Sequence, residues 1–221
     1  MRYPQLDERL QAAADLFTAC DTGADIGADH GRLSCYLLYK NICRHMIVGD
    51  ISAESLSKAK QLLTLHGLSE RADFRVADGL AALTYPVQCA AICGMGGRLM
   101  SGILREGAKN LQEASLVLSC HTEIPLVRET LSDMNYHICE ERLVRAKGRY
   151  YIVMRAEPGK KTYTEKELYL GPGLLSRHPS LWREYLQWRE GVVSCEIGHE
   201  TQLNWIREEL KNETDDSAEC L

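Results

Sequence analysis

Ala24-Asp25-Ile26-Gly27-Ala28-Asp29-His30-Gly31 joins the end of an apolar segment to the start of an amphipathic one. The residues before Gly27 have the pattern of a strand, and residues 33–39 have the pattern of a helix. Such a strand–turn–helix unit needs glycine where a Cβ would block a ligand's approach to the backbone or forbid the φ of the turn. The glycine spacing differs from G-x-G-x-x-G, and no Gly-Lys-Ser/Thr is present, which excludes a dinucleotide fingerprint and a P-loop.

Asp25 stands two residues before Gly27, in a D-x-G arrangement. A carboxylate at this position suits a cofactor with a cationic end better than a pyrophosphate. The pattern therefore indicates S-adenosylmethionine (SAM), with Asp25 and Gly27 in its binding site.

Short apolar segments alternate with helical patterns along most of the chain. Strands are predicted at residues 23–26, 45–50, 73–76, 89–93 and 115–119, and helices at 6–17, 33–39, 53–66, 98–107 and 124–134. This alternation predicts parallel βαβ units with helices on both faces of the sheet. Two further strands, at 136–144 and 149–156, flank a turn and predict a closing antiparallel hairpin. The expected fold class is α/β, a Rossmann-like doubly wound sheet typical of class I methyltransferases.

The pattern changes after residue 157, so we expect a catalytic domain over 1–157 and a second domain over 158–221. Residues 158–178 are rich in glycine and proline and predict a linker or ordered loop. Residues 181–210 have helical periodicity, broken at Gly191 or Gly198, which predicts a small helical domain with two helices as an antiparallel pair. The acidic segment 213–219 predicts a frayed tail.

Composition narrows the class of protein further. The net charge of -5 argues against a protein whose whole surface is basic and coats nucleic acid. Nine cysteines stand without C-x-x-C spacing, so we expect reduced thiols, no disulfide framework and no metal. No apolar segment is long enough to span a bilayer, and we expect a soluble, cytoplasmic protein. The sequence carries no signal for an oligomeric state.

Two aspartates follow the second and third predicted strands. Asp50 can accept hydrogen bonds from both ribose hydroxyls of a nucleoside, although it could also cap the helix that begins after Ser52. Asp78 can accept from an adenine amino group, with Gly79 leaving room for the ring; the alternative is an ordinary turn.

A second glycine cluster, Gly94-Met95-Gly96-Gly97, follows the fourth predicted strand. Amine methylases usually carry Asn/Asp-Pro-Pro-aromatic here, so the glycines favour a ring nitrogen as the methyl acceptor, or else form a tight strand-to-helix turn. Asp29 could orient a base through its amino group. His30 could fix the loop or take part in catalysis, and the pair has no metal-ligand partner at suitable spacing.

These motifs, in this order, resemble the bacterial tRNA (adenine-22-N1)-methyltransferases. The resemblance rests on Asp25-Ile26-Gly27-Ala28-Asp29-His30, Asp78-Gly79-Leu80, Gly94-Met95-Gly96-Gly97, Leu170-Gly171-Pro172, Arg9-Leu10 and Gly67-Leu68. It covers about residues 5–210. The chain departs from the family pattern at Ser119-Cys120-His121, where Gln-Pro-Asn is usual, and at Arg32-Leu33-Ser34.

The resemblance implies methyl transfer from SAM to N1 of adenine 22, in the D-arm region of tRNA. It also implies a small, coiled-coil-like helical C-terminal domain that helps to hold tRNA. Because adenine N1 has an available lone pair, the enzyme mainly aligns the reactants. Asp29 could also stabilise the cationic product. The candidate catalytic residues are Asp29, Gly94 and Met95. The candidate cofactor-binding residues are Asp25, Gly27, Asp29, His30, Asp50, Asp78, Gly79 and Gly94.

A cluster of cations near the predicted hairpin could neutralise tRNA phosphates, or could be an ordinary solvated strand face. It consists of Arg142, Arg145, Lys147, Arg149, Arg155, Lys160 and Lys161. The aromatic series Trp182, Tyr185 and Trp188 favours a packing seam over a base-stacking platform. The alternative functions are methylation of a small molecule or protein, and a catalytically silent nucleoside-binding module.

Overall fold

The computed structural model describes residues 4–218. The chain divides into two compact units, Met1–Thr162 and Tyr163–Leu221. The sequence analysis placed this boundary after residue 157, five residues earlier. Pro158 is the last residue of the last strand of the first unit, and residues 159–162 follow it directly.

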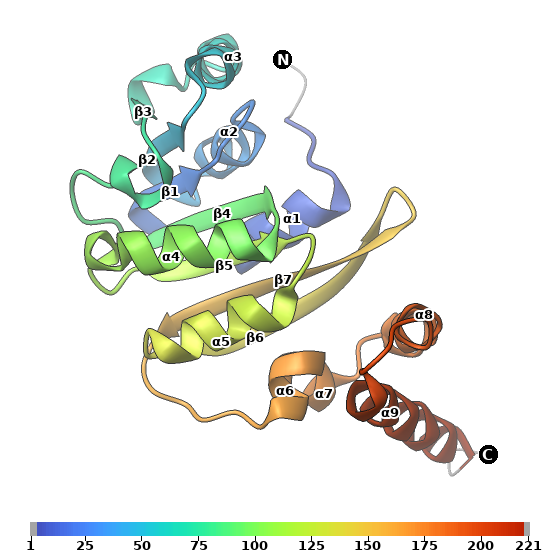
Figure 1. Cartoon of the computed structure of the whole chain (residues 1–221). Coiled ribbons are helices and arrows are strands. Elements are labelled where there is room, and N and C mark those ends of the chain that lie inside the picture. Colours follow the sequence, from blue (N-terminus) through green and yellow to red (C-terminus); the bar gives the residue numbers. More distant parts are fainter. Residues whose placement is uncertain (1–3, 219–221) are drawn as a thin grey trace. The chain divides into compact units, whose positions relative to one another are not determined.

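A seven-stranded sheet forms the first unit, in the order β3-β2-β1-β4-β5-β7-β6 (Figure 1). Its strands are β1 Cys20–Ile26, β2 Cys43–Asp50, β3 Ala72–Val76, β4 Cys89–Met95, β5 Ser115–Cys120, β6 Tyr136–Ala146 and β7 Arg149–Pro158. The first five are parallel, whereas β7 is antiparallel to both β5 and β6. This topology confirms the predicted fold class and its closing hairpin.

Helices cover the sheet on both faces. They are α1 Glu8–Leu16, α2 Arg32–Tyr39, α3 Ala53–Leu65, α4 Gly97–Leu111 and α5 Ile124–Asp133, with short 3₁₀ turns η1 Ser69–Arg71 and η2 Gly79–Ala82. α1, α2 and α3 contact one another in sequence, and α4 contacts α5 on the other face (Figure 1). Residues at the centre of β1, β2, β4 and β5 are fully buried, as expected for parallel strands covered on both sides.

The switch of strand order at β1 and β4 positions the site. β1 lies between β2 and β4, so the chain leaves β1 and β4 in opposite directions across the sheet. Loops that follow adjacent strands at such a switch point enclose a crevice at the carboxyl edge of the sheet. The two glycine clusters of the sequence are these two loops.

The second unit is helical, but its first part differs from the expected linker. Two short helices, α6 Glu165–Leu170 and α7 Pro172–Arg177, occupy much of 158–178. Thr164 and Glu167 form a reciprocal capping box that starts α6, and Pro172 starts α7, so the interpretation of this segment as a loop was wrong.

The predicted helical pair is α8 Trp182–Val193 and α9 Glu200–Ala218, which contact each other. α9 continues through most of the segment expected to fray, and Glu219 lies outside the described residues. Trp182 and Tyr185 are buried and stacked at 5.8 Å, whereas Trp188 is 46% exposed. The first two therefore belong to a packing seam, as predicted.

Every cysteine that the structure describes is a free thiol, and Cys220 lies outside the described residues. Cys35, Cys43, Cys89 and Cys120 are buried, while Cys195 is exposed. Across residues 4–218, none of the helices combines the length and apolar character that a bilayer crossing requires.

Candidate functional site

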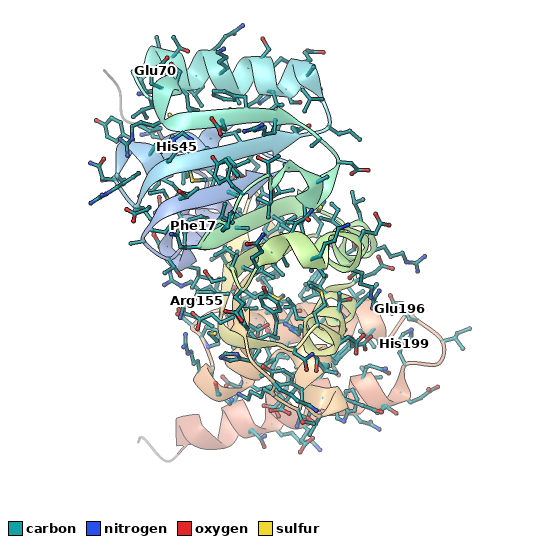
Figure 2. All side chains as sticks on the ribbon, turned by 90° about the vertical axis from the view of Figure 1, so that its left-hand side faces the viewer. Phe17, His45, Glu70, Arg155, Glu196 and His199 are labelled. Carbon is teal, nitrogen blue, oxygen red and sulfur yellow. The ribbon has the colours of Figure 1, made fainter. Side chains whose placement is uncertain are left out.

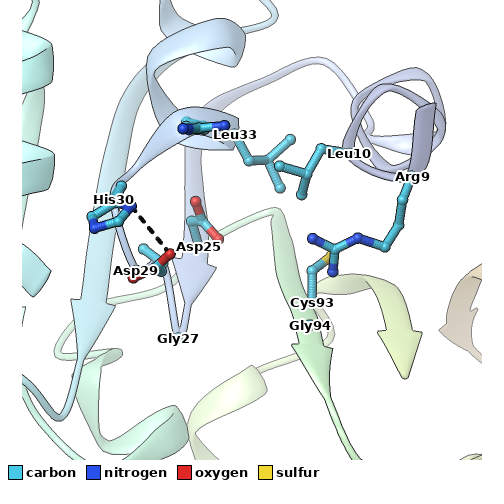
Figure 3. Close-up of a pocket in the computed structure, with 11 residues that line it drawn as sticks. Arg9, Leu10, Asp25, Gly27, Asp29, His30, Leu33, Cys93 and Gly94 are labelled. Carbon is cyan, nitrogen blue, oxygen red and sulfur yellow. Dashed lines mark ion pairs between the residues drawn. The ribbon is translucent and has the colours of Figure 1, made fainter. Parts of the chain in front are cut away.

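A cavity of about 220 Å³ opens at the carboxyl ends of β1 and β4. Its lining comes from α1, from β1 and the loop after it, from the start of α2 and from the end of β4 (Figure 3). The lining residues are Arg9, Leu10, Asp25, Gly27, Ala28, Asp29, His30, Arg32, Leu33, Cys93 and Gly94. The structure thus brings together five of the predicted site residues: Asp25, Gly27, Asp29, His30 and Gly94.

Asp25 is the buried carboxylate of this cavity, with only 3% of its surface exposed. Its Oδ2 accepts hydrogen bonds from the Ser34 hydroxyl at 2.7 Å and the Ser34 amide at 3.3 Å. Burial raises the pKa of the Asp25 carboxyl to about 6, although the two bonds from Ser34 lower it, and the neighbouring Asp50 raises it further. A cationic ligand beside Asp25 would favour its ionised form.

The loop after β1 needs unusual backbone conformations. Gly27, Asp29 and Gly31 all have positive φ, at 70°, 49° and 65°. A Cβ on Gly31 would lie 2.7 Å from the Ala59 Cβ, so glycine there also permits close packing against α3. Asp29 and His30 stand at the cavity mouth, with Asp29 Oδ2 3.4 Å from His30 Nδ1.

Asp50 anchors the same loop from the end of β2. Its Oδ2 accepts from the Asp29 amide at 2.9 Å, and its Oδ1 accepts from the Ser52 amide at 2.8 Å. Ser52 itself caps α3, which rules out the alternative role of Asp50 as the capping residue. Each carboxylate oxygen has a second lone pair, which leaves Asp50 able to accept further hydrogen bonds from a ligand.

The Gly94-Met95-Gly96-Gly97 cluster meets two different demands. Gly94 has φ 85° and forms a bulge between β4 and β5, facing the cavity. Gly97 instead packs on the loop before α5: a Cβ there would lie 2.5 Å from the Thr122 carbonyl oxygen. The Met95 side chain reaches Gly27, with Cε 3.0 Å from the position of a Gly27 Cβ, and Met95 is not part of the cavity lining.

Sequence reasoning did not assign Arg9 a role in this site. Its guanidinium comes from α1, lies over the Tyr151 ring at 5.7 Å and approaches Gly94, whose added Cβ would be 3.0 Å from Nη1. Nη1 is buried and has no hydrogen-bond partner within residues 4–218. Figure 3 shows this cation facing the cavity from the side opposite Asp25 and Asp29. The Arg9-Leu10 match to the family pattern was the available signal.

Asp78 and Gly79 lie in a different hollow. They line a second cavity, of about 510 Å³, between η2 and α4. Gly79 has φ 50°, and an added Cβ would lie 2.9 Å from Ile103 Cγ2, so backbone and packing already require this glycine. Asp50 is outside the lining of both cavities, within the described part of the chain.

The predicted cation cluster divides into two groups. Arg142 pairs with Asp15 at 3.0 Å, and Arg155 (labelled in Figure 2) pairs with Glu157 at 3.6 Å. The five others are exposed: Arg145, Lys147 and Arg149 beside the hairpin turn, and Lys160 and Lys161 after β7. Because Cys120 at the end of β5 pairs with Ile152 near the start of β7, the hairpin turn extends past the edge of the sheet that carries the first cavity (Figure 1).

Strand order 3-2-1-4-5-7-6 with an antiparallel β7, and a ligand crevice beyond β1 and β4 without a dinucleotide fingerprint, define a class I SAM-dependent methyltransferase fold. The model of one family, described as TrmK, tRNA (adenine(22)-N(1))-methyltransferase, matches residues 23–214. The chain belongs to this family, whose members are SAM-dependent enzymes that methylate N1 of adenine in tRNA.

Individual relatives agree with this assignment. The chain is 30% identical over 177 residues to the tRNA (adenine(22)-N(1))-methyltransferase of Bacillus subtilis, covering 79% of this chain and 74% of that protein. It is 32% identical over 158 residues to a candidate tRNA methyltransferase of Mycoplasma pneumoniae, covering 69% and 72%. A candidate tRNA (m1A22) methyltransferase from Streptococcus pneumoniae, solved with SAM, matches with a TM-score of 0.87 and 25% identity over 93% of this chain and 100% of that one.

Proposed function

We propose that this chain methylates adenine 22 of tRNA and that the Arg9–Asp25 cavity holds the methionine end of SAM. One observation carries the placement. A buried, unpartnered guanidinium nitrogen and a buried carboxylate face the same cavity, which matches a ligand end that bears both a carboxylate and cationic groups. SAM supplies an electrophilic methyl group carried on a sulfonium sulfur.

The rest of the cofactor would follow the loops after β2 and β3. Asp50 can accept from the ribose hydroxyls while it still holds the Asp29 amide. Ile51, next in the chain, is 71% exposed and therefore accessible to a ligand beside Asp50; we assign it to one face of the adenine. Asp78 would then accept from the adenine amino group.

The acceptor base would enter beside Asp29, Gly94 and Met95. Asp29 is 71% exposed at the cavity mouth, so its carboxylate is accessible to the amino group of the target adenine. No base is needed to activate N1, which carries its own lone pair; the protein holds the reactants in line and excludes water. The carboxylate of Asp29 also opposes the positive charge that develops on the methylated ring.

The hairpin turn would contact the tRNA backbone. Lys147 and Arg149 are exposed at the same edge of the sheet as the cavity, where phosphates flanking an inserted base would pass. Docking by shape and phosphate contact is the expected mode, since the deep groove of an RNA helix hides its base edges. We assign the protein to the cytoplasm on the ground that its tRNA substrate is there.

The test is methyl transfer from labelled SAM to two unmodified tRNA transcripts that differ only at nucleotide 22, adenine or guanine. The expected product is 1-methyladenosine in the first transcript and no label in the second. Equal labelling of both would overturn the assignment to nucleotide 22. Calorimetric binding of SAM without any tRNA labelling would favour a small-molecule or protein substrate, or a silent nucleoside-binding module.

A further inference from the structure

A group of metal-ligating side chains lies at the other edge of the sheet from the cavity. His137 and Cys139 on β6 and Glu157 on β7 place one donor atom each within 4.8 Å of one another, and all three are partly buried. We propose that these three residues form a binding site for a divalent zinc-type cation. The sequence analysis predicted no metal, because it considered cysteine pairs and the Asp29–His30 neighbourhood.

Strand pairing and alternation on β6 and β7 assemble this group. His137 pairs directly with Glu157 across the hairpin, so their side chains share one face. The register then shifts: Ile138 faces Ala156, but Glu140 faces Arg155, which leaves Cys139 as the extra residue of a bulge. His137 and Cys139 are two residues apart on β6, so strand alternation already places both side chains on one face, where the Cys139 thiol lies beside the His137 ring.

The separation of the donors fits a tetrahedral ion. His137 Nε2 and Cys139 Sγ lie 3.4 Å apart. Zinc–sulfur and zinc–nitrogen bonds of about 2.3 and 2.0–2.1 Å, at the tetrahedral angle, put the two donor atoms about 3.5 Å apart. The two residues therefore need almost no rearrangement to share one cation.

Gly159 fixes the orientation of the imidazole. A Cβ on Gly159 would lie 2.9 Å from His137 Nδ1, so only glycine leaves room for the ring at this place. The Gly159 amide donates to the Asn135 carbonyl at 2.8 Å, which holds the backbone against the ring. With Nδ1 on the Gly159 side, Nε2 points to Cys139.

The chemistry of the donors selects the ion. Thiolate and imidazole favour zinc and related transition metals, while a set with only one carboxylate is unsuited to Mg²⁺ or Ca²⁺. Arg155 Nη1 lies 3.6 Å from Glu157 Oε1 and competes with a cation for the carboxylate. A carboxylate has two oxygens, so Arg155 and the ion can use different ones, with water as the fourth ligand.

The site would clamp the open end of the β6–β7 hairpin and the first residue beyond it. Ala156 pairs with Leu116 near the start of β5, whereas the cavity lies beyond the strand ends, so the cation is remote from the cofactor. Its expected effect is on the stability of the first unit and not on methyl transfer. The proposal is independent of the function proposed above.

The experiment uses the full chain, stripped of metal with a chelator and titrated with Co²⁺, then with Zn²⁺. We expect one Co²⁺ per chain with a thiolate-to-cobalt charge-transfer band, displacement of that band by Zn²⁺, and a higher melting temperature with Zn²⁺ bound. Cys139→Ser should abolish the band, and His137→Gln should lower affinity by at least the 10–100-fold that loss of a supporting contact costs.

Cys195→Ser is the matched control, since Cys195 is an exposed thiol in the second unit. It should keep the band and the affinity. Cys139→Ser should keep the metal-free melting temperature and the rate of methyl transfer, which separates loss of a ligand from loss of the fold. No charge-transfer band in the parent chain, or a band that survives Cys139→Ser, would overturn the proposal.

Discussion

Asp25→Asn tests the buried carboxylate on which the proposed cofactor site depends. Burial raises the pKa of Asp25 to about 6 in the folded protein, from 3.8 for an aspartate in water. About two units at roughly 1.4 kcal/mol per unit correspond to about 3 kcal/mol. Between about pH 4 and 6, Asp25 is protonated in the folded state and ionised in the unfolded state. The folded state therefore loses about this much stability, relative to the unfolded state, as pH rises through this range. The asparagine side chain does not titrate, so the stability of the variant does not fall with pH for this reason.

The free energy of unfolding of both proteins should be measured in urea at intervals from pH 4 to 7. The difference between Asp25→Asn and the parent should shift by about 3 kcal/mol in favour of the variant as pH rises across this range. Far-UV circular dichroism is the suitable signal, because all three tryptophans lie in the second unit. A difference that stays flat with pH would refute the reasoning.

Asp21→Asn is the control on the same strand. Its side chain is 71% exposed, so removal of this carboxylate should leave stability nearly unchanged at every pH. The same Asp25→Asn protein should bind SAM more weakly at pH 7.5, since it lacks the anion beside the cationic ligand. If Asp25→Asn is more stable than the parent but binds SAM more weakly, Asp25 serves cofactor binding and lowers the stability of the folded state.

Three further outcomes follow from the site. Gly97→Ala should destabilise the protein by about 1–3 kcal/mol in thermal melts, because the added Cβ would lie 2.5 Å from a backbone oxygen. Gly102→Ala, on the same helix but with open space around the added Cβ, should be neutral or slightly stabilising. Arg9→Met should weaken SAM binding about tenfold or more by calorimetry and Arg9→Lys less, whereas equal affinity of all three would remove Arg9 from the cofactor site. The double substitution Lys147→Ala, Arg149→Ala should weaken tRNA binding and reduce its salt dependence without changing SAM affinity; an unchanged salt slope would contradict a phosphate contact.

The fold was predictable because its signals are local. Each parallel strand is a short apolar run, each crossover helix has its own periodicity, and the handedness of the crossover then limits the strand order. The second unit shows where composition misled. Gly171-Pro172 was interpreted as a loop, although Thr164 with Glu167, and proline at a first helical position, are helix-start signals.

The site was predictable only in part, because some of its residues are far apart in the sequence. Asp25, Gly27 and Asp29 are neighbours in the chain, so one motif identifies them together. Arg9 reaches the cavity from a helix that precedes the first strand, and no spacing rule connects it to Gly94. The His137–Cys139–Glu157 group depends on the pairing register of β6 and β7, and the His137 and Cys139 spacing alone does not reveal which residue of the partner strand faces them.

The glycines show why a family motif can be specific without each residue touching a ligand. Gly94 opens the cavity beside Arg9, but Gly97 and Gly79 are required by a carbonyl oxygen and by Ile103. An added methyl group at either of the last two would displace the loop or helix that positions the cavity, although neither lines it beside Asp25. Within the Gly94–Gly97 cluster, Gly94 leaves room for the cavity, and Gly97 allows close packing of the loop that supports it. This is the physical reason that the whole Gly94–Gly97 cluster, and not a single glycine, distinguishes this site from an ordinary strand-to-helix turn.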